Sequence, residues 1–213
     1  MARRSYGQLC PIAHALDLVG ERWTLLVVRE LILGPKRFTD LQDSLPGIGT
    51  NILSARLKQL EQIGVLQRRR LAPPAASWVY ELTERGDELA DIVLRLGRWG
   101  IHSPTFADLD APARTEWTIL SLKARYNPDA ASDAPTRIEL HLGADTYNLQ
   151  HSDQQLSIER GTATNADLVL TLEPATLTAL LRGQLRPPDT RTNGVTILTG
   201  TTAAYERFLR LFT

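Results

Sequence analysis

The sequence predicts an α+β protein of two domains, and a change in its hydrophobic pattern near residue 103 is the main reason. Up to residue 102 the apolar residues recur at helical spacing, whereas beyond residue 114 they alternate with polar residues as in half-buried strands. The chain has 213 residues, of which 43% are hydrophobic, and a chain of this length can bury a core without disulfides or metals. Residues 103–114 contain Pro104, Asp108, Asp110 and Pro112 and show no strong hydrophobic periodicity. We therefore expect a linker between domains 1–102 and 115–213.

Three short helices are expected at the start of the chain. Two stripes of apolar residues at steps of three or four predict the first two helices: Ile12, Leu16 and Val19, then Trp23, Val27 and Leu31. Gly34-Pro35 ends the second helix, because proline cannot extend a helix and glycine tolerates its terminal conformation. Thr39 and Gln42 have the spacing of a capping box. They predict a third helix that stops at the Pro46-Gly47 turn.

A longer helix, a hairpin and a final helix complete the first domain. We expect the longer helix over residues 50–63, with an inner face formed by Leu53, Leu57 and Leu60. Two strands over residues 65–71 and 78–82 follow, joined by a proline-containing loop. Thr83 then caps a last helix that ends near residue 100.

The second domain is predicted to hold a curved, mainly antiparallel sheet with two helices interspersed. The inward-facing residues of its strands are expected to be Ile138, Leu140 and Leu142, then Leu156 and Ile158, then Leu168, Leu170 and Leu172. One helix begins near Pro174, which suits a first helical turn, and ends at Gly183. The helical spacing of Tyr205, Phe208 and Phe212 predicts the other helix at the end of the chain.

The tryptophans of the first domain bear on its core. Aromatic residues at helical spacing are more often buried than used for stacking on a ligand. We therefore place Trp23 and Trp99 in the core and leave the placement of Trp78, beside the hairpin, open.

The order of elements in the first domain is typical of a winged helix-turn-helix. A short capped helix, a Pro-Gly turn, a second helix and a hairpin with basic residues follow one another between residues 39 and 82. In this arrangement the second helix enters the major groove of DNA, the first helix braces it, and the hairpin reaches the flanking backbone. The ordered combination favours DNA binding over an ordinary solvated helix beside a basic strand.

Several polar residues are candidates for contacts with double-stranded operator DNA. For groove contacts we select Thr50, Asn51, Ser54 and Arg56. Asparagine pairs with adenine and arginine with guanine through two hydrogen bonds, whereas threonine and serine serve bases or phosphates. For contacts with the phosphate backbone we select Lys58 and the run Arg68-Arg69-Arg70.

Charge and targeting patterns limit the location and the partners of the protein. The chain is neutral overall, so it carries no uniformly basic coat. Residues 1–103 hold 14 basic and 11 acidic side chains, a small excess that only hints at polyanions. No apolar run approaches the ~20 residues of a membrane span, and no signal peptide is recognisable. We expect a cytoplasmic protein without a membrane partner.

The first domain resembles the HxlR family of bacterial transcriptional regulators over about residues 8–101. The resemblance is carried by Cys10-Pro11-Ile12, Gly20-Glu21-Arg22-Trp23, Leu31-Ile32-Leu33-Gly34-Pro35-Lys36-Arg37-Phe38, Leu57-Lys58-Gln59-Leu60-Glu61 and Gly64-Val65-Leu66. It implies a homodimer in which the first and last helices of this domain pack across the two-fold axis. It also implies that the helix over residues 50–63 recognises DNA, and that the hairpin is the wing. A dimer predicts a pseudo-palindromic operator.

The second domain is similar to the sterol carrier protein type two domain over roughly residues 115–213. The similar segments are 166–172, 180–183 and 194–200. Such a domain holds an apolar ligand between a sheet and its helices, so the resemblance implies a lipid-like or polyketide-like small-molecule effector. A dimerisation or scaffolding domain whose apolar strands are simply core stays an equal alternative.

Redox, metal and catalytic chemistry are the alternatives to this interpretation. Cys10 is the only cysteine and a possible redox site, because a thiolate near a helix start is activated by the helix dipole. A small apolar role for Cys10 against the dimer mate is the favoured alternative. No histidine stands at metal-ligand spacing and no catalytic motif occurs. We therefore expect no metal, no cofactor and no enzymatic activity.

The sequence therefore predicts a homodimeric, sequence-specific DNA-binding transcriptional regulator, whose DNA binding an apolar effector modulates. Repression is the commoner mode for this architecture, and we expect a repressor. Two alternatives remain: a redox-responsive regulator that works through Cys10, and a lipid-binding carrier whose helical half docks a partner.

Overall fold

The computed structural model describes residues 5–107, 109, 114–130, 134, 136–152, 154–185 and 194–212. The chain divides into two compact units, residues 1–93 and 94–213. Helix α5 (Glu84–Ile101) spans the division, and helix α6 (Pro104–Ala107) falls at the start of the expected linker. Residues 108 and 110–113 of that linker lie outside the described residues. The domain limits expected from the sequence stay predictions.

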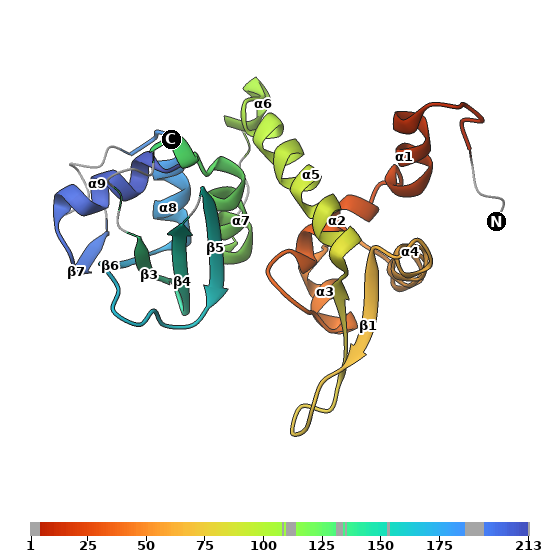
Figure 1. Cartoon of the computed structure of the whole chain (residues 1–213), viewed down its shortest axis with the longest axis horizontal. Helices are drawn as coiled ribbons and strands as arrows, with labels where there is room; N and C mark the ends of the chain where they lie inside the picture. The colour runs from red at the N-terminus through yellow and green to blue at the C-terminus, as the bar shows by residue number, and fades with distance from the viewer. Residues whose placement is uncertain are drawn as a thin grey trace. The chain divides into compact units, whose positions relative to one another are not determined.

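The first unit contains the predicted elements in the predicted order (Figure 1). They are α1 (Pro11–Val19), α2 (Thr24–Leu31), α3 (Phe38–Ser44), α4 (Thr50–Gln62), β1 (Leu66–Arg70), β2 (Trp78–Leu82) and the first part of α5. Strands β1 and β2 pair antiparallel, with Leu66 opposite Leu82 and Arg70 opposite Trp78. This is the winged helix-turn-helix arrangement expected from the sequence, and it is confirmed.

One apolar core holds the helices of this unit against the base of the hairpin. Its buried residues come from α2, α3, the following turn, α4, the hairpin and α5: Val27, Val28, Leu31, Leu41, Leu45, Ile48, Leu53, Leu57, Leu60, Val65, Leu66 and Ala90. The three leucines predicted for the inner face of α4 are all in this cluster. Burial of that stripe leaves the opposite face of α4 to solvent.

The placement of Trp99 in the core is wrong, because 76% of this side chain is exposed. Trp23, in contrast, packs against the core as expected. Ile12 and Leu16 on α1 are also exposed although their spacing is helical. Helical periodicity locates an apolar face but does not say whether the same chain covers it.

The cap of α3 differs from the predicted capping box. The N-cap residue is Arg37, and its backbone N–H donates to Oδ2 of Asp40 at 3.0 Å. The helix therefore begins at Phe38, two residues earlier than a Thr39 cap allows. Gln42 does not reach back to the helix start; its amide donates to Oγ1 of Thr50 at 3.0 Å and ties α3 to α4.

A glycine in α5 sets how closely this helix approaches the hairpin. A Cβ on Gly86 would lie 2.1 Å from the carbonyl oxygen of Val65, whereas the nearest atom to a Cβ on Gly97 is 3.9 Å away. We expect Gly86→Ala to lower the free energy of unfolding by at least about 2 kcal/mol, because backbone must move. Gly97→Ala, the same change on the same helix, is expected to raise it by about 0.5–1 kcal/mol through helix propensity. Urea denaturation measures both, and equal effects would contradict the close approach.

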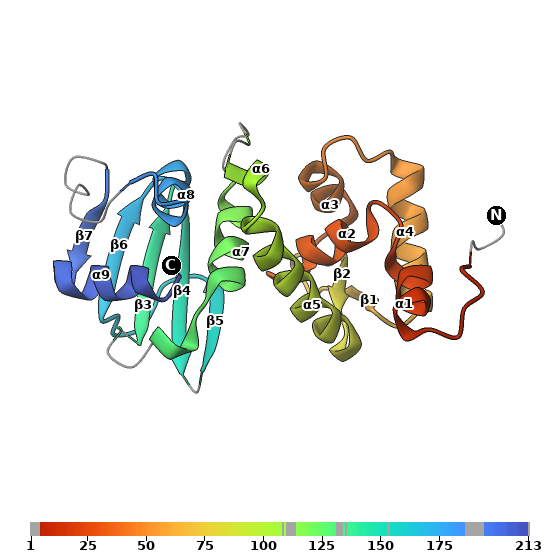
Figure 2. The ribbon, with the colours of Figure 1, turned by 90° about the horizontal axis from the view of Figure 1, so that it is seen from above.

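The second unit is a five-stranded sheet with helices. After α5 and α6 its elements are α7 (Thr115–Arg125), η1 (Pro128–Ala130), β3 (Arg137–Leu142), β4 (Asp145–Ser152), β5 (Gln155–Arg160), β6 (Leu168–Leu172), α8 (Pro174–Leu181), β7 (Thr196–Thr199) and α9 (Thr202–Arg210). The strand order is β5-β4-β3-β6-β7 (Figure 2). Among the described strands only β3 and β6 pair in parallel, so the predicted mainly antiparallel sheet is confirmed.

The burial of this sheet follows the predicted alternation. Side chains of β3 and β6 alternate between fully buried and half-buried, and the buried ones are the leucines and the isoleucine selected from the sequence. Strand β4 was not predicted, because His151 takes one of its inward positions beside Tyr147 and Leu149. Helix α7 was also missed. Within the described part of the chain, no helix is both long and apolar enough to cross a membrane.

Candidate nucleic-acid interface

The outer face of α4 is presented to solvent by the turn that precedes it. Gly47 adopts a φ of +87°, which favours glycine, and the buried Ile48 anchors the turn in the core. On α4 the exposed side chains of Asn51, Ser54 and Lys58 follow one another at helical spacing. The structure therefore brings these three predicted contact residues together on one face, away from the leucine stripe.

Arg56, a fourth predicted contact residue of α4, lies on another side of the helix. Arg56 stands two positions after Ser54 and two before Lys58, and side chains at that spacing point to different faces of a helix. Its side chain is half-buried, and Nη1 donates to Oε1 of Gln59 at 2.5 Å. Gln59 in turn donates to the carbonyl oxygen of Leu18 at 2.7 Å. Arg56 is thus held toward the end of α1.

The three arginines of the wing have different surroundings. Arg69 makes a bidentate ion pair with Glu81, with Nε 2.8 Å from Oε1 and Nη2 2.8 Å from Oε2. This pairing holds the pKa of Glu81 below its ordinary value. The guanidinium of Arg68 instead lies over the ring of Trp78, 4.5 Å from the ring centroid. Nε of Arg70 donates to the carbonyl oxygen of Ala76 in the wing loop, at 3.4 Å.

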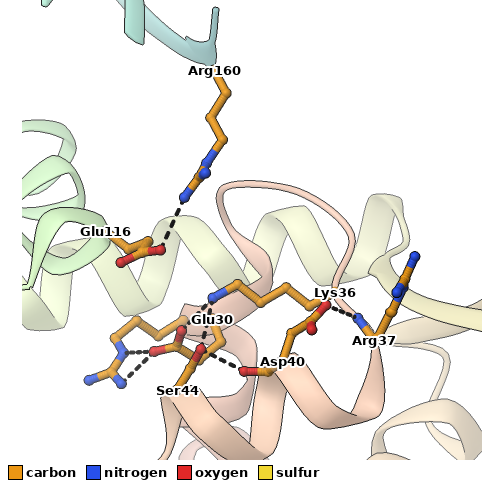
Figure 3. Close-up of polar contacts among 8 residues, drawn as sticks. Glu30, Lys36, Arg37, Asp40, Ser44, Glu116 and Arg160 are labelled. Atoms are coloured by element: carbon orange, nitrogen blue, oxygen red, sulfur yellow. Dashed lines mark hydrogen bonds and ion pairs between the residues drawn. The ribbon is translucent and has the colours of Figure 1, made fainter. Parts of the chain in front are cut away.

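A buried ion-pair cluster connects the wing to the helix-turn-helix. The carboxylate of Glu30, whose side chain is 2% exposed, lies 2.7 Å from Nζ of Lys36 and 2.6 Å from Nη2 of Arg29. In Figure 3 the Lys36 side chain reaches Glu30 while that of Arg37 points away from it. The backbone of Lys36 also exchanges two hydrogen bonds with Tyr80 of β2, at 3.0 and 2.8 Å. Glu30 thereby fixes the Lys36 segment, which leads into α3 and pairs with β2 of the wing.

Figure 3 also draws an ion pair of the second unit, which is a separate feature. Arg160 of β5 bridges Glu116 of α7 at 3.0 Å and Asp145 of β4 at 3.1 Å. More than half of the Arg160 side chain is exposed, so this pair contributes little to stability.

Replacing Glu30 by glutamine is expected to lower the free energy of unfolding by about 2–3 kcal/mol at neutral pH, because two cations lose their buried partner. Burial raises the pKa of Glu30, but hydrogen bonds and attraction from Lys36 and Arg29 outweigh it and hold the pKa below its ordinary value of 4.5. The ionised Glu30 carboxylate therefore stabilises the fold fully above the unfolded-state pKa. This stabilisation is lost as the pH falls through the lower folded-state pKa.

Urea denaturation of the wild type and of the Glu30→Gln variant between pH 7 and pH 3 measures both effects, because only the wild type can lose this stabilisation as the pH falls. The matched control is Glu81→Gln, whose partner Arg69 is 47% exposed, and it should cost no more than about 1 kcal/mol. An equal loss in the two variants would contradict a special role for the buried carboxylate.

Cys10 is the N-cap residue of α1 and is half-buried. Among the residues that the structure describes, no group of three or more His, Cys, Asp or Glu side chains is placed to hold a metal ion.

The fold and this surface define a helix-turn-helix protein of the winged type. Residues 18–105 match the model of the HxlR-like helix-turn-helix family. The HTH-type transcriptional regulator YodB of Bacillus subtilis is 35% identical over 92 residues, which are 43% of this chain and 82% of the relative. YvaP, an HTH-type transcriptional regulator of the same organism, is 34% identical over 104 residues, which are 47% of this chain and 96% of the relative. The chain belongs to the HxlR family.

Solved structures also match part of the chain. The reduced form of YodB from B. subtilis has 34% sequence identity and a TM-score of 0.39, and the match covers 44% of this chain and 92% of that one. The family model ends at residue 105, so family membership describes the first half of the chain.

Proposed function

We propose that the protein is a homodimeric transcriptional regulator that reads a pseudo-palindromic operator with α4. The observation that carries this proposal is the exposed polar face of α4, with Asn51, Ser54 and Lys58 together, beside the basic hairpin. Membership of the HxlR family and regulators as relatives support it. Repression and a cytoplasmic location are the expected mode and place of action.

The proposed contacts divide between the groove and the backbone. Asn51 suits two hydrogen bonds to adenine, and Ser54 and Thr50 suit bases or phosphates at the start of the helix. Arg56 reads guanine only if it first leaves Gln59, so we assign it the smallest part among the groove contacts. Lys58 and the three wing arginines neutralise phosphates.

Exposed apolar side chains on α1 and α5 support the homodimer. Leu9 beside α1, and Ile12 and Leu16 on it, are exposed. On α5, Ile92, Leu96 and Trp99 are exposed at spacings of four and three residues, which form one stripe. A second copy of the chain would cover such surfaces, which soluble proteins seldom leave open. Two recognition helices then address half-sites about 34–36 Å apart.

Fluorescence anisotropy across a salt series tests the DNA binding. The labelled fragment is the DNA upstream of the protein's own gene, or, if that fails, a fragment selected by genome-wide pull-down; scrambled DNA is the control. We expect tight binding to the operator that beats the control and weakens steeply with salt. Equal weak binding of all selected fragments and scrambled DNA would overturn the proposal and favour a lipid-binding carrier.

An apolar effector held by the second unit is the proposed signal. The resemblance to sterol carrier domains supports it, and so does a sheet whose buried face is mostly apolar, beside helices that bury leucines. A coupling of ~1–3 kcal/mol would change operator affinity about 5–150-fold. The fluorescent fatty acid cis-parinaric acid is a suitable probe. Saturating binding of the probe without a change in operator affinity would contradict gating by such ligands.

A redox-responsive regulator is the second candidate, and the position of Cys10 as the N-cap of α1 favours it. Its thiol is only half-buried, so an oxidant can reach it. Cys10→Ser separates the candidates: under diamide, a redox regulator loses its response in this variant, whereas an effector-gated regulator behaves as the wild type does.

A further inference from the structure

The strand alternation of β1 divides the three wing arginines between two faces. Cross-strand partners in an antiparallel pair share a face. Arg68 is opposite Tyr80 and Arg70 is opposite Trp78, whereas Arg69 is opposite Val79. Arg68, Arg70 and Trp78 therefore lie on one face of the wing, which we call the Trp78 face. Arg69 lies on the other face with Glu81.

On the Glu81 face, the positive charge of Arg69 is already compensated. Its fork donates to both carboxylate oxygens of Glu81 at 2.8–2.9 Å, and Gln67 donates to the same carboxylate at 3.0 Å. A phosphate that approached Arg69 would meet the Glu81 charge at the same place. Arg69 would have to break a bidentate pair to bind DNA, so its net gain is small.

On the Trp78 face, Arg68 is positioned without being neutralised. Its guanidinium stacks on the indole ring at 4.5 Å, and the ring itself is 49% exposed. Stacking holds the plane of a guanidinium but leaves the N–H groups at its edge free to donate in two parallel bonds to a phosphate. Among the ion pairs between described residues, none includes Arg68 or Arg70.

We propose that the Trp78 face is the surface with which the wing binds phosphates of duplex DNA, and that Trp78 is a positioning residue for Arg68. Arg69 makes no DNA contact. The ligand is the sugar-phosphate backbone that flanks the sequence read by α4. This inference rests on the proposed function, and it changes the assignment of the arginine run from three backbone contacts to two.

Salt-dependent anisotropy on the operator and on scrambled DNA tests this division, with Arg68→Ala, Arg69→Ala, Trp78→Ala and Trp78→Phe. Each neutralised phosphate contributes about 0.9 to the slope of log K against log salt. For each half-site of the dimer, Arg68→Ala should lower the slope by about one and weaken binding to either DNA about eightfold at ~0.1 M salt. Arg69→Ala, the matched control, should leave the slope unchanged.

The tryptophan variants separate positioning from a merely structural role. Trp78→Ala should weaken both DNAs in the same way as Arg68→Ala, and the double variant should be no weaker than Arg68→Ala alone. Trp78→Phe should restore most of the binding, because phenylalanine also accepts a stacked cation. Circular dichroism melting identifies any variant that fails to fold, and the Phe variant then carries the test.

Two results would overturn the inference and spare the proposed function. One is a salt slope for operator binding that falls as much in Arg69→Ala as in Arg68→Ala. The other is a loss of DNA affinity in the Arg68→Ala, Trp78→Ala double variant that equals the sum of the two single losses. Wild-type protein that binds operator and scrambled DNA equally would instead remove the proposed function, and this inference with it.

Discussion

Replacing Asn51 by alanine is expected to weaken operator binding by about 1–3 kcal/mol for each half-site, which is about 5–150-fold. Asn51 is exposed in the first turn of α4, the part of a recognition helix that meets base edges. Loss of its amide removes two hydrogen bonds to one base but no charge. Affinity for scrambled DNA, measured by anisotropy at the same salt concentration, should therefore stay almost constant.

Gln62→Ala is the matched control for this experiment, since it removes an exposed amide from the last residue of the same helix. It should change operator affinity by less than about twofold, within the ±0.5 kcal/mol of ordinary surface substitutions. If Asn51→Ala weakens operator and scrambled DNA equally, Asn51 reads no base. If operator affinity is unchanged in the variant, α4 is not the reading helix.

Replacing Leu96 by glutamate is expected to convert the proposed dimer to a monomer and to weaken operator binding by about 10²–10⁴-fold. Leu96 is the central residue of the exposed stripe on α5 and is 48% exposed, so the chain should tolerate the charge while a second copy should not. Two linked binding modules gain a factor of this size over one, because the second contact forms at high effective concentration. Sedimentation equilibrium should report the monomer mass of 23.7 kDa.

Arg95→Glu is the control for the dimer experiment. It places a new negative charge on the neighbouring exposed position of α5, outside the apolar stripe. We expect it to remain a dimer and to keep most of its affinity. A Leu96→Glu protein that sediments at the dimer mass would move the interface away from α5, and α1 would then be the helix to change.

The elements of the first unit were predictable because their signals are local. The leucine spacing of α4, the Pro-Gly turn before it and the Thr83 cap each depend on residues within a few turns of one another. Thr83 does accept a hydrogen bond from the backbone N–H of Gly86, at 3.2 Å. In contrast, strand β4 lacked a clear alternation because a histidine occupies one of its inward positions.

The candidate site was predictable in its residue types but less so in its geometry. Asn51, Ser54 and Lys58 share a face because helical spacing alone dictates it. The stack of Arg68 on Trp78 had no clear signal in the sequence, because the register of the hairpin decides which residues are diagonal neighbours. The role of Glu30 was also missed, since a lone glutamate in a helix gives no sign of the two cations that bind it.

By itself the sequence determined the order of the elements in the first unit, the inner face of α4 and the winged helix-turn-helix class, all of which depend on spacing along the chain. Only the tertiary structure decided which candidate side chains are available to DNA. Arg69 is bound by Glu81, and Arg56 is tied through Gln59 to Leu18, 41 residues from Gln59. These partners meet because packing brings distant segments together, and residue type and local spacing carry no information about such encounters.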